Sequence, residues 1–75
     1  MNKLTDKYHR WVAWSDDDQA YLGRCPDLFL GGVHGEDPLK VAAQLQHVID
    51  QWEIEHLASH SAFPPVRIKP MMEVA

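Results

Sequence analysis

The sequence has one cysteine, few basic residues and no long apolar run. Of its 75 residues, 7 are Lys or Arg and 11 are Asp or Glu, so the formal net charge is -4. A lone cysteine, Cys25, excludes a disulfide within the chain. The basic side chains are scattered, which argues against direct nucleic-acid binding, because that binding relies on clustered Lys and Arg. An acidic chain is better suited to a basic protein partner.

Targeting signals are also missing. No signal peptide, lipidation motif or membrane-length apolar run is present, so we expect a reducing, cytoplasmic compartment and no membrane partner. The composition, 45% hydrophobic and 24% charged, is that of a folded protein. Its length suits a single domain, 1–75, with flexible ends at 1–6 and 71–75. Such a domain buries only about 60% of its unfolded surface, so we expect a partner chain to contribute to its stability.

Three short strands are predicted in the first half of the chain. "YHRWVAW" (8–14) and "AYLGR" (20–24) are rich in aromatic and branched residues and flank the acidic "SDDDQ". This pattern predicts a β-hairpin with a loop of about four residues. "FLGGVHG" (29–35) predicts a third strand, in which Gly31 and Gly32 indicate a bulge or a close backbone approach.

A long helix is predicted to follow. Asp37 and Pro38 form an N-cap followed by proline at the first helical position, and no Gly or Pro interrupts the chain from there to Ala58. Apolar residues recur at helical spacing: Val41, Ala42, Leu45, Val48, Ile49 and Trp52. "SHSAFPP" ends the helix, and "VRIKP" (66–70) predicts a last strand. The predicted fold class is α+β in the order β-β-β-α-β, a small three- or four-stranded, antiparallel-rich sheet with the helix packed on one face.

The order and spacing of these segments resemble the HicB family of bacterial antitoxins. The resemblance covers 8–65 and rests on Tyr8, the acidic hairpin, "PDL" (26–28), "GGVHGEDP" (31–38) and the late "PP". It implies a partial ribonuclease-H-like fold. Two features depart from the family: the usual "PDLPGC" reads "PDLFLGG", and the C-terminal DNA-binding region of typical members has no counterpart up to Ala75. The family's operator binding is therefore not carried over.

The resemblance also implies a function. HicB antitoxins mask a small basic, mRNA-cleaving toxin of the HicA type, so we expect a protein-binding module that neutralises such a toxin by occlusion and is not an enzyme. The alternative is a stand-alone, homo-oligomeric HicB-like domain with a structural or ligand-binding role and no toxin partner. An antitoxin should co-purify with a short basic protein, whereas the alternative protein should co-purify only with copies of itself.

Three groups of side chains suggest chemistry, but each has a plainer interpretation. Asp16–Asp18 lacks the glycine and glutamate of a calcium loop, which favours a solvated turn that is also an acidic docking point for a basic partner. His56 and His60 have zinc-ligand spacing but no third ligand, which favours a role at the helix C-terminus. Cys25 could be a nucleophile with His34 as its base. Nothing in the sequence lowers the pKa of its thiol, which favours a small, buried apolar side chain. We predict no catalytic residue, no metal site and no cofactor.

The tryptophans point to an interface. Side chains alternate along a strand, so Trp11 and Trp14 are predicted on opposite faces of the sheet, and one helix covers only one face. Either one ring lies across the sheet edge or under the C-terminal tail, or the second face meets another chain. In the second case, the residues predicted to contact a partner or a second copy are Trp11, Trp14, Tyr21 and Phe29. We expect self-association as a symmetric dimer or a dimer of dimers.

Overall fold

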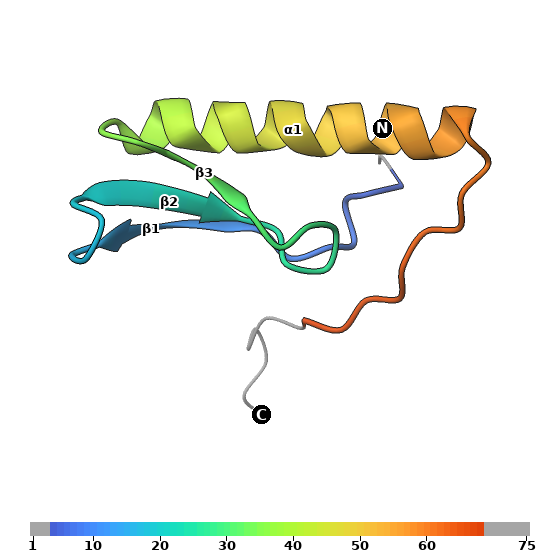
Figure 1. Ribbon diagram of the computed structural model, residues 1–75, viewed down its shortest axis with the longest axis horizontal. Coiled ribbons are helices and arrows are strands. Elements are labelled where there is room, and N and C mark those ends of the chain that lie inside the picture. Colours follow the sequence, from blue (N-terminus) through green and yellow to red (C-terminus); the bar gives the residue numbers. More distant parts are fainter. Residues whose placement is uncertain (1–3, 69–75) are drawn as a thin grey trace.

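The computed structural model describes residues 4–68 as a three-stranded antiparallel sheet and one helix (Figure 1). The strands β1 (Trp11–Ser15), β2 (Ala20–Arg24) and β3 (Gly32–Gly35) lie in the order β1-β2-β3, and α1 (Pro38–Ala58) follows them. The helix runs along one face of the sheet (Figure 1). The α+β class is therefore confirmed. Within residues 4–68, α1 is not long and apolar enough to cross a membrane.

The hairpin between β1 and β2 has the predicted loop length. Ser15 pairs with Ala20, which leaves a loop of four residues, 16–19. Gln19 closes the loop with a φ of 52°, in the left-handed region. The Ser15 hydroxyl donates to Asp18 Oδ2 at 2.9 Å and accepts from the Asp18 N–H at 3.3 Å, so a single side chain ties the loop together.

Two glycines allow close packing in the sheet. A Cβ on Gly32 would collide with the carbonyl oxygen of Gly23, so the predicted close backbone approach is confirmed at Gly32. A Cβ on Gly31 would meet nothing within 4 Å. Gly23 itself faces the helix, since its Cβ would lie 3.2 Å from Val41 Cγ1 and 3.2 Å from Leu45 Cδ2. The helix therefore packs directly against the backbone of β2.

The core lies between α1 and this face of the sheet. Its buried apolar side chains come from the N-terminal turn, the connection after β2, β3 and the helix, and they are Tyr8, Cys25, Val33, Val41, Leu45 and Ile49. Val41, Leu45 and Ile49 of the predicted helical stripe are thus buried, and Val48 and Trp52 are partly buried. Ala42 was expected in the same stripe, but it is exposed because it lies about 100° around the helix from Val41.

The helix starts as predicted. Asp37 is extended (φ -109°, ψ 116°), and its Oδ1 accepts the N–H of Leu39 at 2.9 Å. Pro38 occupies the first helical position, where no N–H is needed. At the other end the Ser59 N–H donates to the carbonyl of Glu55, and the chain then leaves the helix axis.

Residues 61–68 return along the molecule without forming a strand (Figure 1). The strand predicted over 66–70 is therefore not seen as far as Ile68, and residues 69 and 70 lie outside the described residues. The N–H groups of Arg67 and Ile68 both donate to Asp27 Oδ2, at 2.9 and 3.0 Å. Because a single carboxylate oxygen takes both amides, they are not available to a strand partner.

The same tail contacts the body of the molecule at three further points. The Tyr8 hydroxyl donates to the carbonyl of Pro64, and Phe63 packs edge to face against Trp52 with ring centroids 5.1 Å apart. Val66 is partly buried against the core. These contacts and the Asp27 bonds fasten residues 63–68 across the molecule, and we call this segment the strap.

The N-terminal segment is also docked onto the core. Residues 4–6, part of the segment expected to be flexible, lie in a turn, and Thr5 is fully buried. The Thr5 N–H donates to Glu53 Oε1 at 3.1 Å, and its carbonyl accepts from the Arg10 guanidinium. The Thr5 hydroxyl has no hydrogen-bond partner among the described residues. Burial and backbone bonding thus hold this turn against α1.

Candidate functional site

No helix or strand of residues 4–68 covers the face of the sheet turned away from α1, and we call it the outer face. Because Gly23 faces the helix, its neighbours Leu22 and Arg24 point to the opposite side. Directly paired residues share a face, so the register places Trp11 beside Arg24, and Ala13 and His34 on either side of Leu22. The outer face therefore combines apolar groups with two basic side chains.

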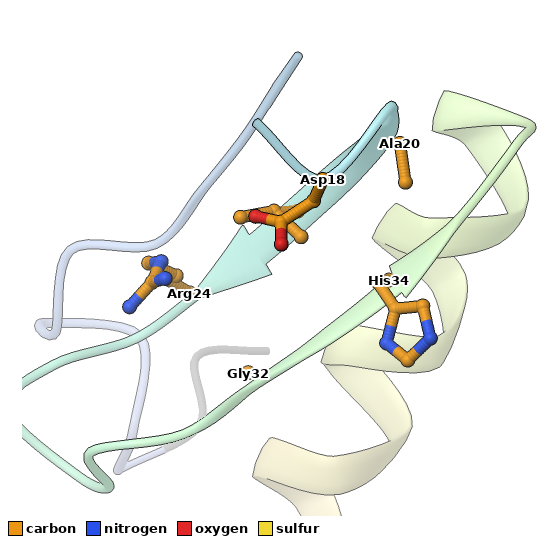
Figure 2. A pocket seen from close by; sticks show the side chains of 6 residues that line it. Asp18, Ala20, Arg24, Gly32 and His34 are labelled. Carbon is orange, nitrogen blue, oxygen red and sulfur yellow. The ribbon is translucent and has the colours of Figure 1, made fainter. Parts of the chain in front are cut away.

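A hollow of about 380 Å³ lies on this face (Figure 2). Gly32, which pairs with Arg24 in the register, lines this hollow without a side chain of its own. The lining residues come from the hairpin loop, β2 and β3, and they are Asp18, Ala20, Leu22, Arg24, Gly32 and His34. The hollow has an apolar floor and charged side chains at its rim.

The polar groups at the rim are exposed, and its two charged groups are not paired with each other. Asp18, Arg24 and His34 are all exposed, and within residues 4–68 the Arg24 guanidinium forms no ion pair with Asp18 or any other carboxylate. The Asp18 carboxylate accepts only the hydroxyl of Ser15 among the described residues. In Figure 2, Asp18 lies on the hairpin side of the hollow and Arg24 toward the other end of β2. A cation and an anion on the same face thus remain available to a second molecule.

A second exposed surface lies at the hairpin loop, and we call it the hairpin end: Trp14, Asp16, Asp17 and Asp18. The Trp14 side chain is 48% exposed, its Nε1 donates to Asp16 Oδ1 at 2.7 Å, and its ring packs edge to face on Tyr21 at 5.1 Å. These contacts fix the orientation of the indole. An oriented, half-exposed indole within an acidic loop is suited to contacting a basic protein surface.

The four residues predicted to form one interface occupy three places. Trp14 and Tyr21 are paired across the hairpin and contact each other on the helix side of the sheet. Trp11 lies on the outer face, where its ring stacks on His9 at 5.1 Å. Phe29 follows β2 and is partly buried against the core. The prediction that Trp11 and Trp14 face opposite sides is confirmed, but the four side chains do not share one surface.

Sequence reasoning missed the basic residues of the outer face. A usable signal for Arg24 was present in "AYLGR", because Leu22 and Arg24 have the same parity in β2. His34 becomes a neighbour of Leu22 only through the register of β2 with β3. The same register places Gly32 beside Arg24, so the outline of the hollow follows from the pairing of the strands.

The remaining polar groups have structural surroundings. His56 stacks on Trp52 with ring centroids 3.6 Å apart, and its Nδ1 lies 3.1 Å from the Trp52 carbonyl. His60 lies beyond the helix with a φ of 56°. No group of three or more His, Cys, Asp or Glu in residues 4–68 is arranged to hold a metal ion. Cys25 is fully buried, and this burial raises the pKa of its thiol despite the opposing charge of Arg10.

No protein-family model, curated protein or solved structure gives a significant match to this chain.

Proposed function

We propose that this chain is a HicB-like antitoxin-type module that neutralises a small basic HicA-type mRNA-cleaving toxin by occlusion. The observation that supports this proposal most is the hairpin end, where a half-exposed indole is oriented by its bond to Asp16, the first of three exposed carboxylates in the loop. The order of three antiparallel strands followed by one long helix agrees with the fold that the resemblance implies.

Occlusion at the hairpin end requires no chemistry from this chain. An RNA-cleaving protein holds phosphates with basic side chains, and the same side chains are attracted to Asp16–Asp18. Trp14 supplies the large apolar contact that a central interface residue needs. A toxin bound in this way has its RNA-binding surface covered, so the antitoxin competes directly with the substrate.

The proposal is tested by co-expressing this chain with the short basic protein encoded beside it and measuring RNA cleavage. We expect the partner alone to cleave RNA and the purified complex to be inactive. Asp17→Lys should weaken the complex about tenfold, because it replaces an attraction by a repulsion at the contact. Glu55→Lys, on the exposed side of α1, changes the net charge equally and should leave the affinity unchanged.

Three outcomes would overturn the proposal: a partner that does not cleave RNA, cleavage that continues in the complex, or equal effects of the two lysine variants. The alternative function, a stand-alone homo-oligomeric domain with a structural or ligand-binding role, is favoured by one observation, the uncovered outer face. It predicts that the tagged chain isolated from its own cell carries only copies of itself.

A further inference from the structure

We propose that two copies of this chain associate outer face to outer face, with Arg24 of each copy against Asp18 of the other. This inference concerns a second copy of the chain and does not depend on a toxin. It uses the outer face, whereas the proposed toxin contact uses the hairpin end. Asp18 belongs to both surfaces, so Arg24 and Asp17 are the residues that distinguish them.

Charges of opposite sign lie toward the two ends of β2 on the outer face. Arg24 is the last residue of β2, and Asp18 precedes its first residue, Ala20, by two positions. Both side chains line the same hollow, and neither forms an ion pair within residues 4–68. A face that carries a cation at one end of a strand and an anion at the other is complementary to itself when the second copy runs in the opposite direction.

Two-fold symmetry between the two copies would form this charge pair twice. A two-fold axis that lies between two facing sheets and runs perpendicular to β2 places the two β2 strands antiparallel across the interface. This operation brings Arg24 of each copy toward Asp18 of the other and keeps the two Leu22 side chains near the axis. The charge pair is therefore formed twice, as an isologous interface requires.

Apolar side chains lie on the outer face together with these charges. Trp11, Ala13 and Leu22 share the outer face, and α1 covers only the opposite side. A facing sheet removes these side chains from water at a gain of about 25 cal/mol for each Å² of apolar area. The hollow lined by Ala20 and Leu22 offers room for side chains of the facing copy.

The size of this face sets the expected strength. With strands about 4.8 Å apart and a rise of about 3.3 Å per residue, the outer face measures roughly 14 by 17 Å. This is well below the roughly 800 Å² per partner of a standard interface, so the dimer should be weak and reversible. We expect it to form between about 10 μM and 1 mM, and to weaken as salt is added.

Charge exchange is the decisive experiment, measured by sedimentation equilibrium of the whole chain at several concentrations. Arg24→Glu and Asp18→Arg should each weaken the dimer by about tenfold or more, since each turns two attractions into two repulsions. The double variant R24E/D18R should restore it, because the attraction is re-formed with reversed signs. Far-UV circular dichroism and the thermal midpoint establish that each variant is folded.

Matched controls separate this pairing from a general charge effect. Lys40→Glu and Asp17→Arg change the net charge as R24E and D18R do, but neither residue lines the hollow, so the dimer should be retained. A wild-type chain that is monomeric at about 1 mM would overturn the proposal. So would a dimer that persists in both single variants, or one that the double variant fails to restore.

If a single variant does not fold, the double variant and the two controls still test the pairing of Arg24 with Asp18. Loss of toxin inhibition in Asp17→Lys together with an intact dimer would separate the two surfaces. Conversely, failure of the dimer with intact inhibition would overturn this inference and leave the proposed function standing.

Discussion

At the scale of single residues, burial controls two ionisable groups beside the core. Burial raises the pKa of the Tyr8 hydroxyl, and the negative charge of Asp27 raises it further. Burial also raises the pKa of the Cys25 thiol. Both groups are therefore held in their neutral forms by the fold. Their ordinary values are 10.0 and 9.0, so the consequence appears in alkaline solution.

The first prediction is a loss of stability at high pH. Below about pH 9 both groups keep their protons in the folded and unfolded chains, so the stabilisation is fully present. Above it, the unfolded chain releases protons that the folded chain retains, and the free energy of unfolding falls. Urea unfolding at about pH 8 and pH 10 should show this fall, and Cys25→Ala should reduce its size. An identical pH dependence in the variant would exclude Cys25 as a contributor.

The second prediction concerns the helix cap. Asp37→Ala removes the acceptor of the Leu39 N–H and should lower the free energy of unfolding by about 0.5 to 2 kcal/mol. Glu36→Ala, at the neighbouring exposed position, is the control and should have little effect. Equal thermal midpoints for the two variants would remove the cap from the account of stability.

The third prediction concerns the contact of the helix with β2. Gly23→Ala places a methyl group 3.0 to 3.2 Å from side chains of β3 and α1, and this overpacking should cost about 1 to 3 kcal/mol. Gly31→Ala adds the same atom where nothing lies within 4 Å, and it should be neutral. Denaturant midpoints measure both, and a tolerated alanine at Gly23 would contradict the close packing described here.

At the scale of elements, success in prediction follows the range of the interactions. The hairpin loop and the start of α1 are set by neighbouring residues, such as the bonds of Ser15 to Asp18 and of Asp37 to Leu39, so they could be predicted from the sequence. The last strand could not be judged in this way. The amide of Arg67 binds a carboxylate 40 positions earlier, and no local pattern reports such a partner.

The fourth prediction tests that long-range bond. Asp27→Ala should release the strap, because the N–H groups of Arg67 and Ile68 lose their common acceptor. Hydrogen exchange of these two amides should become fast, while amides of the helix interior keep their protection. Asp17→Ala removes an exposed carboxylate that accepts no strap amide and should leave the exchange rates unchanged. Slow exchange at Arg67 in the first variant would mean that other contacts hold the strap.

At the scale of the whole molecule, the arrangement of the candidate sites depends on pairing between strands. Alternation within one strand suffices to separate Trp11 from Trp14, and this prediction is confirmed. The hollow beside Gly32 required the register of all three strands, and the burial of Phe29 required the path of the chain after β2. For this reason the faces of the two tryptophans could be predicted from the sequence, but the outline of the outer face could not.

The fifth prediction separates the two surfaces that carry Trp11 and Trp14. Trp11→Gln alters the outer face and should shift the chain toward monomer in light scattering, because apolar area is lost from the proposed dimer contact. Trp14→Gln alters the hairpin end and should leave the proposed self-association intact while weakening the proposed complex with a basic partner. The two variants are matched in chemistry and differ in face. If Trp14→Gln alone dissociated the copies, the helix side of the sheet would be the contact.

The strap also has a consequence for the order of folding. Its bond between Tyr8 and Pro64 joins residues 56 positions apart, whereas the hairpin and α1 depend on close neighbours. Closing so long a loop is entropically costly and slow, so the hairpin and helix should form first and the strap last. Under mild denaturant the strap is then the first part to open. Since Cys25 lies in the core that the strap covers, the rate at which a thiol reagent modifies it would time that opening.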